Sequence, residues 1–477
     1  MTVLSNPLGK IGKILITLAI IVLLLMGGVG YTAWYYLKRE VPVVYDSPEE
    51  HFKYGSINSG GLPYWIWVVL PSLFPEHLPG PGGYTSVGYI WEPGKENPVG
   101  ISKSTIGFEK QGVTCAMCHS ATYRKSPEDT PTLVLGAPAQ KFDTQANIRF
   151  LSACGKDPRF TADYILPAIE EKHHLSWIEK QLYSRLLIPQ TQKALMGLGQ
   201  GFAWMNSRPD AGPGRIPSFN PVKFINFGLP LDDTIDNVDD PPLWNEKQHK
   251  GFAYHWDGLE TDLTEVAIMG ALAAGTKPDN VPLEDLRRVE DFIREVQPPA
   301  YPFEVNQELV AKGKPIFEKN CATCHAFGGD RTGTVIPVEE VGTDRHRIDM
   351  WTQAAVDKYE AVGDGTEWDF THVQKTDGYV AVSLDGIWLR APYLHNGSVP
   401  YLSDLLEVSE NRTPVFYRSY DVYNPEKVGF VSEGPEAAKE GFKYDTAAEA
   451  NSNQGHLYGT TLPTEDKQAL VEYLKTL

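Results

Sequence analysis

The chain has 477 residues, 42% of them hydrophobic, which is enough for two or three domains with apolar cores. Its formal net charge is −18, and phosphate binding needs clustered Lys and Arg, so we expect no nucleic-acid partner.

The first predicted element is a transmembrane helix. Residues 14–37 carry no charge and are long enough to cross about 30 Å of hydrocarbon. Lys10 and Lys13 precede the stretch, and the aromatic run Trp34–Tyr36 ends it. Because flanking lysines favour the cytoplasmic side, we expect a single-pass anchor in a bacterial inner membrane, with the chain after Lys38 in the periplasm. A cleaved signal peptide is the alternative, although its apolar segment is usually only about 7–15 residues long.

The next segment, residues 40–100, is rich in Pro, Gly and aromatic residues. Trp65, Trp67 and Phe74 need burial, and a disordered linker carries fewer aromatic residues. We therefore expect an irregular but packed lead-in to the first domain.

Two Cys-x-x-Cys-His motifs follow. The first, in QGVTCAMCHSATYR, holds Cys115, Cys118 and His119; the second, in EKNCATCHAFGG, holds Cys321, Cys324 and His325. Zinc and dithiol redox chemistry are alternatives. A zinc site, however, wants four close ligands, and a redox pair would sit beside a βαβ pattern in the cytosol. Both motifs therefore predict covalent c-type haem, with iron bound by His119 and by His325. The fifth cysteine, Cys154, is expected to be a buried thiol.

Each haem motif opens a region that closes with an amphipathic helix. In the first region, apolar residues recur at helical spacing over 283–296 before Pro298-Pro299; in the second, Thr464 is a plausible cap for the final helix. Long alternating runs are absent, so the chain is expected to be mainly α with long loops. The predicted segments are 1–39 (anchor or signal), 40–100 (lead-in), 101–300 (first haem domain with an enlarged insert) and 301–477 (second haem domain).

The face of each iron opposite the motif histidine decides function. A second strong ligand makes an electron-transfer haem, whereas an open face can bind dioxygen or peroxide. The candidates for this position, which spacing alone does not rank, are His255, His395, His456, Met205 and Met269.

Several motifs resemble a known group of cytochromes. LRAPYLHNGSVPYLSDLL resembles a segment of bacterial dihaem cytochrome c peroxidases. The fuller set, with HWDG at 255–258, GPGR at 212–215 and SNQGHLYG at 452–459, resembles the rubber-oxygenase-like branch of that superfamily over roughly residues 100–477. The resemblance implies two cytochrome c-like domains in tandem. It also implies that His456 is the second ligand of the C-terminal haem, that His395 lies near a haem edge or the interface, and that the N-terminal haem binds dioxygen or peroxide.

The same resemblance suggests catalytic roles for His255, Trp256 and Arg215. Trp256 would lie near the N-terminal haem and relay electrons or shape the pocket, and a buried structural Trp is the alternative. Arg215 would pair with a haem propionate, with a structural salt bridge as the alternative. Asp257 is expected to be a cap or an ion-pair residue. Calcium between the domains is possible, but no acidic spacing demands it.

Two functions compete. The first is a haem oxidoreductase, oxygenase-like or peroxidase-like, in which the N-terminal haem activates dioxygen or peroxide and the C-terminal haem transfers electrons. The second is a non-catalytic electron carrier of a respiratory chain with both irons fully ligated; in either case a redox protein is the expected partner. A strict peroxidase assignment is disfavoured, because such enzymes use a methionine on the C-terminal haem and only Met350 follows His325. The expected tether and the shorter chain set this protein apart from secreted rubber oxygenases.

Overall fold

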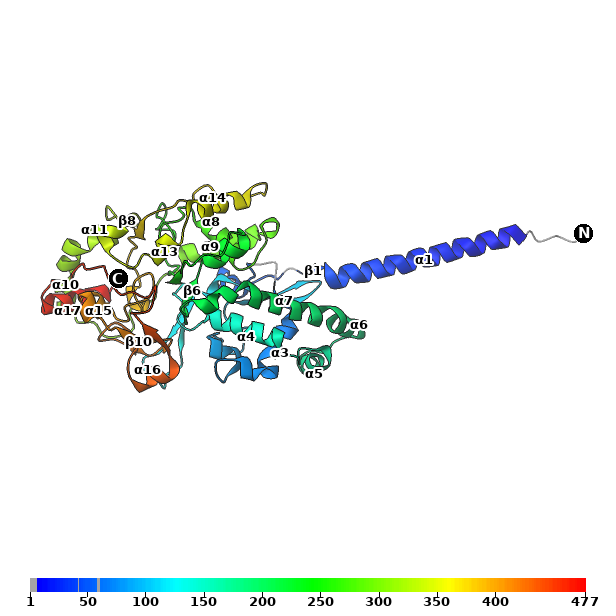
Figure 1. Cartoon of the computed structure of the whole chain (residues 1–477), viewed down its shortest axis with the longest axis horizontal. Helices are drawn as coiled ribbons and strands as arrows, with labels where there is room; N and C mark the ends of the chain where they lie inside the picture. The colour runs from blue at the N-terminus through cyan, green and yellow to red at the C-terminus, as the bar shows by residue number, and fades with distance from the viewer. Residues whose placement is uncertain (1–6, 42, 58–60) are drawn as a thin grey trace, which may run out of the picture.

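A computed structural model describes residues 7–41, 43–57 and 61–477. Helices make up 44% of the structure and strands 12%, so the chain is mainly helical, as predicted. One long helix, α1 (Pro7–Leu37), projects from one end of an elongated globular body (Figure 1). Residues 1–6 of the predicted anchor lie outside the described residues.

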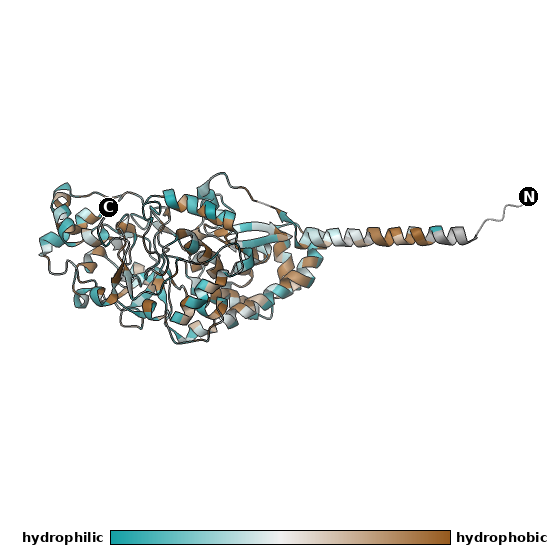
Figure 2. Ribbon diagram, turned by 90° about the horizontal axis from the view of Figure 1, so that it is seen from above, coloured by the Kyte–Doolittle hydropathy of each residue, from teal (hydrophilic) through white to brown (hydrophobic). Residues whose placement is uncertain are grey.

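Helix α1 is long and apolar enough to cross a membrane. The apolar part, Leu15–Leu37, has 23 residues with a mean hydropathy of 2.3, and none of it is buried. At 1.5 Å per residue it extends about 34 Å, slightly more than the hydrocarbon core. Its middle is the most hydrophobic part of the projecting helix (Figure 2). A signal sequence would have the same properties, so both interpretations of the sequence remain.

The lead-in is packed, as predicted, but it is less irregular than expected. Trp65, Trp67 and Phe74 are all buried. They belong to a helix, α3, or to its C-cap, in a segment whose Pro and Gly content predicted loops. Pro63 stands just before the first helical residue, where its fixed φ does no harm, and Pro71 is accommodated near the helix end. The elements before the first motif are β1 (Glu40–Val41), α2 (Pro48–Tyr54), α3 (Tyr64–Leu73), η1 (Pro75–His77), η2 (Gly83–Val87), β2 (Ile101–Ile106) and β3 (Phe108–Val113).

The strands form small antiparallel pairs rather than one large sheet. The largest sheet has the order β1-β2-β3, and β2 and β3 form a hairpin that leads directly into the first motif. The remaining pairs are β4 (Ser120–Tyr123) with β5 (Thr132–Leu135), β6 (Arg215–Pro217) with β7 (Asn237–Asp239), β8 (Val335–Pro337) with β9 (Gly378–Val380), β10 (Val415–Arg418) with β13 (Phe442–Asp445), and β11 (Tyr423–Asn424) with β12 (Gly429–Phe430).

Helices dominate the insert that follows the first motif, and the helix predicted to close this region is present. It is α9, which ends before Pro298-Pro299 as expected. Cys154 lies in α4 and is fully buried, in agreement with the sequence. The helices here are η3 (Cys115–Met117), α4 (Thr144–Lys156), α5 (Ala162–Lys172), α6 (Trp177–Leu182), η4 (Tyr183–Leu187), α7 (Ile188–Gly201), η5 (Ala203–Ser207), η6 (Val222–Asn226), α8 (Leu263–Ala273), η7 (Pro278–Asn280) and α9 (Leu283–Glu295).

The second region begins and ends with two helices that pack against each other, α10 and α17. Gly313 of α10 allows this approach, because a Cβ there would lie 2.0 Å from the carbonyl oxygen of Ala469. The cap prediction for α17 is wrong: Thr464 is its first residue, and Pro463 holds the N-cap position without a side-chain hydrogen bond. The helices are α10 (Gln307–Asn320), α11 (Ala322–His325), α12 (Val338–Val341), α13 (His346–Asp349), α14 (Gln353–Glu360), η8 (Ala361–Gly363), η9 (Ile387–Leu389), α15 (Leu402–Leu405), η10 (Ser409–Asn411), α16 (Gly434–Glu440) and α17 (Thr464–Leu474).

The hydrophobic cores cross the boundary predicted near residues 297–303. The core beside Cys115 includes Met350 and Tyr359 from the second region. The core beside Cys321 includes Tyr123 and Trp244 from the first region. The two haem motifs therefore lie in cores to which both halves of the chain contribute.

Candidate haem sites

The first motif follows β3 in a short helical turn. Thr114 caps the turn by accepting a hydrogen bond from the amide of Ala116 at 3.1 Å, and the amide of His119 donates to the carbonyl of Cys115 at 3.0 Å. The Nδ1 atom of His119 donates to the carbonyl of Pro241 at 2.9 Å. A carbonyl can only accept, so Nδ1 carries the proton and Nε2 keeps a free lone pair. Burial lowers the pKa of His119 to about 4, which keeps the ring neutral.

The second motif has the same arrangement at the end of α10. His325 is the last residue of α11, and its Nδ1 donates to the carbonyl of Val382 at 2.7 Å. Burial lowers the pKa of His325 as well. Each motif therefore presents a neutral imidazole whose Nε2 is free for a metal and whose Nδ1 is held by a distant carbonyl, the second-shell pattern of metal-ligating histidines.

The motif cysteines disfavour zinc and dithiol redox chemistry. Burial raises the pKa of Cys115 to about 12 and that of Cys321 to about 11, and it raises the pKa of Cys118 as well. Zinc ligation and thiol exchange both use the thiolate, which these surroundings suppress.

The second motif opens into a cavity of about 240 Å³. Its wall is largely aliphatic, as expected of a pocket for a flat apolar cofactor. The aliphatic residues come from every part of the second region: Ile336, Val341, Val380, Val382, Leu384, Ile387, Leu394, Leu402, Leu405, Leu406, Leu470 and Leu474. Met350 is not part of this wall; it lies fully buried in the core beside Cys115.

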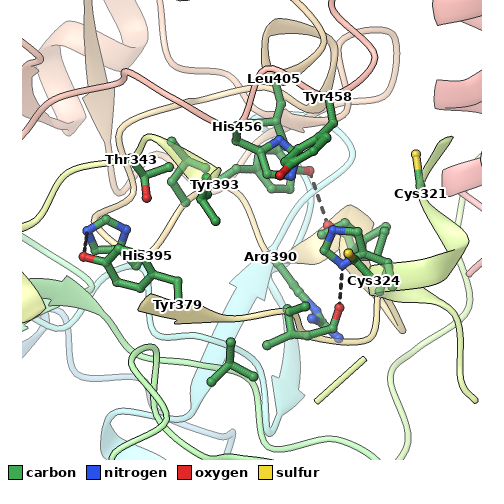
Figure 3. Close-up of a pocket in the computed structure, with 18 of the residues that line it drawn as sticks. Cys321, Cys324, Thr343, Tyr379, Arg390, Tyr393, His395, Leu405, His456 and Tyr458 are labelled. Atoms are coloured by element: carbon green, nitrogen blue, oxygen red, sulfur yellow. Dashed lines mark hydrogen bonds between the residues drawn. The ribbon is translucent and has the colours of Figure 1, made fainter. Parts of the chain in front are cut away.

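His456 and His325 both line this cavity, with 6.2 Å between their ring centroids. Figure 3 shows His456 in the cavity wall with Cys324 of the motif. A metal–imidazole bond is about 2.0–2.1 Å for zinc, and two imidazoles sharing one ion at such a distance put their centroids about 6 Å apart. Burial lowers the pKa of His456 to about 3, and its Nδ1 has no partner among the described residues. The pair has the spacing and the protonation state of two ligands to one iron.

Arg412 holds the loop that carries His456. Its guanidinium donates to the carbonyls of Gly455 at 2.9 Å and of His456 at 3.2 Å, and it also reaches the carbonyl of Asn453. The amide of His456 donates to Val341 at 2.7 Å, and His456 has a positive φ of 46°. An unfavourable backbone conformation is thus maintained by a buried cation with several carbonyl partners.

His395 lines the same cavity but is engaged elsewhere. Its ring stacks on Tyr379 with the centroids 4.1 Å apart, and its Nε2 lies 3.0 Å from the Tyr379 hydroxyl (Figure 3). The hydroxyl itself donates to the carbonyl of Asp344 at 2.6 Å. His395 therefore lies in the wall of the same pocket, but its Nε2 is already engaged by Tyr379.

The residues of the cavity fit a haem. Besides the aliphatic wall and the paired imidazoles, buried polar atoms in the wall lack hydrogen-bond partners: Thr343 Oγ1, Arg390 Nε and His456 Nδ1. Unpaired buried donors are costly, and the carboxylates of the haem propionates would offer hydrogen-bond acceptors to Thr343 Oγ1 and Arg390 Nε. The donor set and the apolar wall therefore match a haem attached at Cys321 and Cys324.

A different group of residues surrounds the first motif. His255 is close enough for its charge to act on the pKa of His119, and its Nε2 lies 3.0 Å from a carboxylate oxygen of Glu260. Glu260 is fully buried and accepts a second hydrogen bond, of 2.6 Å, from the hydroxyl of Tyr359. Among the residues that the structure describes, no second histidine ring faces His119 as His456 faces His325.

The other predicted site residues lie between the two motifs or away from both. Trp256 lines the cavity of the second motif and donates to the carbonyl of Asp239 at 2.6 Å; the neighbouring Asp240 and Pro242 also line that cavity. Arg215 is fully buried and donates to the carbonyls of Ala211 and Asn237 at 3.2 and 2.9 Å; it is not part of the cavity wall.

Asp257 is an ion-pair residue, as the sequence predicts. Its carboxylate lies 3.1 Å from the guanidinium of Arg347, which is also paired with the buried Asp236. This pairing ties the HWDG segment of the first region to α13 of the second.

No calcium site emerges among the described residues. One group of three potential metal ligands is present, Glu76 and His77 of η1 and Asp157 at the C-cap of α4, and it does not lie between the two motifs. Arg159 already pairs with both carboxylates, which opposes cation binding there.

The partners that complete the sites were not foreseen from the sequence. Glu260, Tyr359, Tyr379 and Arg412 stand in ordinary sequence surroundings, and only the fold brings them to the histidines. The one available signal was the position of Arg412 in a turn-rich stretch shortly after LRAPYLHNGS.

Comparison with known proteins finds a match to a cytochrome c-like family in the second region. Residues 378–417 match a family described as RoxA-like, cytochrome c-like. This stretch contains β9, His395 and Arg412, and the match supports a c-type cytochrome with haem iron and the resemblance to rubber-oxygenase-like proteins.

Two relatives are found in Sinorhizobium fredii (strain NBRC 101917 / NGR234). "Uncharacterized protein y4iM" is 31% identical over 250 residues, which is 47% of this chain and 56% of the relative. "Uncharacterized protein y4iJ" is 40% identical over 114 residues, which is 22% of this chain and 19% of the relative. The chain thus spans about half the length of the first relative and a fifth of the second.

Proposed function

We propose that this chain is a membrane-tethered periplasmic cytochrome with two covalently bound c-type haems that acts as an oxidoreductase. In this proposal the first site binds and activates dioxygen or peroxide, and the second site transfers electrons. The observation that carries it is an asymmetry. Both motif histidines donate Nδ1–H to a carbonyl, but among the described residues only His325 has a second imidazole opposite, with 6.2 Å between the ring centroids.

At the second site the proposed iron ligands are His325 and His456, with attachment at Cys321 and Cys324. Haem iron with two strong ligands transfers electrons, whereas iron with an open face binds dioxygen or peroxide. His395 is assigned a neighbouring role, because its Nε2 is already engaged by Tyr379 at 3.0 Å.

At the first site the proposed attachment is at Cys115 and Cys118, with His119 as the iron ligand. The pair of His255 and Glu260 supports a reaction that needs a proton. A carboxylate that holds one ring nitrogen fixes the tautomer of the histidine, and Tyr359 in turn fixes the carboxylate. His255 is therefore placed to hold or move a proton beside His119.

Trp256 is proposed to lie on the route between the two sites. It lines the cavity of the second site, and its hydrogen-bond acceptor, Asp239, lies two residues before Pro241, the carbonyl partner of His119. Arg215 is proposed to support the same interface from a buried position rather than to touch substrate.

Low-temperature EPR of the oxidised full-length protein tests the proposal. One high-spin and one low-spin signal are expected, because only the second iron has two strong ligands. Two low-spin signals that persist after partial reduction would instead favour the non-catalytic electron carrier.

If the high-spin signal is present, peroxide and dioxygen are the first reactants to test. The His255→Gln variant should react more slowly with peroxide while keeping the high-spin signal. His372→Gln is the matched control, since His372 also pairs with a glutamate, Glu265, but lies half exposed at the surface. Equal rates in both variants would remove His255 from the proposed proton path.

A further inference from the structure

The root of α1 is joined directly to the globular body. Immediately after α1, β1 pairs with β2, and the amide of Gly107 at the hairpin tip donates to the carbonyl of Arg39 at 2.6 Å. The guanidinium of Arg39 lies over the Tyr35 ring, 4.7 Å from its centroid. Because there is no long linker here, the end of the body from which α1 projects lies close to any membrane that α1 crosses.

Helix α6 lies at that same end. In Figure 1, α6 and α5 lie at the end of the body from which α1 projects, and α6 reaches at least as far along the long axis as the root of α1. Figure 2 shows hydrophobic helix segments at this end of the body. The first two residues of α6 are large, apolar and exposed: Trp177 is 74% exposed and Ile178 is 40% exposed. A single exposed apolar side chain is ordinary, but an adjacent Trp and Ile facing solvent is a feature of interaction surfaces.

The exposed pair is held rigidly. A capping box formed by Ser176 and Glu179 fixes the start of α6. On the preceding turn, His173 stacks on Trp65 of α3 with the centroids 4.4 Å apart, and the following Tyr183 is buried in the same core. Trp177 is therefore presented by a fixed element rather than by a loose loop.

The charges of α6 are also compatible with a lipid surface. Its only acidic residue is Glu179, which is engaged in the capping box, and its only basic residue is Lys180, which pairs with Glu170 of α5. On a chain with a net charge of −18, this short helix is neutral and its carboxylate is satisfied. An indole ring suits the boundary between headgroups and hydrocarbon, where one part of the ring is apolar and its N–H is wet.

We propose that α6 is a second membrane contact, in which Trp177 and Ile178 enter the headgroup region of the bilayer that α1 spans. The occupant of this surface is a phospholipid bilayer, and the argument is continuity: the exposed Trp34 near the end of α1 and Trp177 of α6 belong to one end of the molecule. The inference rests on the proposed anchor. A single helix would allow the body to tilt on the membrane, whereas two contacts fix its orientation. The helices α10 and α17, at the opposite end of the body, are then held away from the membrane (Figure 1).

Spin labels on the full-length protein in bilayer nanodiscs test this contact. Cys154 is buried and the four motif cysteines are taken up by haem, so a single introduced cysteine is the labelled site. Three variants are compared: Leu24→Cys in α1, Ile178→Cys in α6, and Lys314→Cys on α10 at the far end. Accessibility to oxygen and to a water-soluble nickel reagent reports the depth of each label.

The expected result is a Leu24 label in the hydrocarbon, an Ile178 label at headgroup depth and a Lys314 label in water. Adding Trp177→Ser should return the Ile178 label to water while the haem spectrum stays unchanged. If the Leu24 label lies in the bilayer but the Ile178 label is as exposed to water as the Lys314 label, the proposed membrane contact of α6 is wrong and the proposed anchor is supported. If the Leu24 label is in water, the anchor itself is wrong and the inference falls with it.

Lipid composition separates insertion from simple attraction. Because α6 is neutral, the depth of the Ile178 label should be the same in phosphatidylcholine and in mixtures with phosphatidylglycerol. A contact that forms only with the anionic lipid would overturn insertion of Trp177 as the cause.

Discussion

The two Cys-x-x-Cys-His sites share one design on the motif side and differ on the other. His119 and His325 each give an Nδ1 proton to a backbone carbonyl far away in the sequence. Opposite His325 the fold brings a second imidazole, held by Arg412, into an aliphatic cavity. Near His119 it brings His255, which is paired with a buried carboxylate. The same local motif is thus given different neighbours by segments that follow much later in the chain.

The largest expected effect separates the two sites by removing one attachment at a time. The double variants Cys115→Ala/Cys118→Ala and Cys321→Ala/Cys324→Ala should each lower haem content from two per chain to one, measured by pyridine haemochrome absorbance. The first should retain the low-spin EPR signal and the second should lose it. A variant that keeps its full haem content would show that its motif does not attach haem.

The next effect concerns the ligand opposite His325. His456→Ala should convert the second site to high spin and let it bind an added ligand such as cyanide, because the facing imidazole is gone. His395→Ala is the matched control, since His395 lines the same cavity but is bonded to Tyr379. Loss of the low-spin signal in the His395 variant, with its retention in the His456 variant, would reverse the assignment.

A smaller effect is expected from the residue that positions His456. Arg412→Met leaves several buried carbonyls without a donor, at about 1–3 kcal/mol for each. Unfolding by denaturant should therefore require less denaturant, and the second site should show a mixture of spin states.

Arg412→Lys is the informative partner of that variant. Lysine keeps the charge but reaches fewer of the carbonyls, so an intermediate spectrum is expected. If both variants keep an unchanged low-spin signal, Arg412 stabilises the fold without setting the geometry of His456.

The sequence predicted those parts of the sites that are local. The two motifs, the apolar α1, the closing helices α9 and α17 and the buried Cys154 all depend on spacing or composition within a short stretch. The sequence did not predict α3, because the Pro and Gly content of this segment indicates irregular structure. Pro63, however, stands at the helix start and Pro71 near its end. In this segment, burial of Trp65 and Trp67 in a large aromatic core outweighs the low helix propensity of proline.

Sequence patterns do not predict which distant residues contact the site histidines. The hydrogen-bonded pair of His255 and Glu260 is close in sequence, whereas the facing imidazoles of His325 and His456 are far apart in it. His456 and His395 had similar turn-rich surroundings, and spacing could not choose between them. Their difference lies in which partner reaches them, and that depends on how β9 brings Tyr379 against His395.

The smallest predicted effect is a pH dependence of the free energy of unfolding that arises from His346 in α13. His346 lies 2.9 Å from the carboxylate of Asp344, and this hydrogen bond, opposed by partial burial, raises the pKa of His346 above 6.5. A raised pKa in the folded state means that the stabilisation is fully present below the unfolded value of about 6.5 and is lost as the pH rises through the folded value. Because His346 is more than a third exposed, solvent screening limits the effect to about 0.2–1 kcal/mol.

His346→Gln should therefore lower the free energy of unfolding relative to wild type at about pH 5.5, with the difference shrinking by about pH 8.5. The control is His372→Gln. Glu265 also raises the pKa of His372, but His372 lies on a segment that does not line the second cavity. The backbone carbonyl of Asp344 accepts a hydrogen bond from the hydroxyl of Tyr379, and the Tyr379 ring stacks on His395 in the cavity wall. For this reason only the His346 variant should also change how the absorbance of the second site depends on pH. Identical absorbance in the two variants at every pH would mean that the ion pair stabilises the loop without reaching the cavity, and the pH sensitivity would then no longer distinguish the two sites.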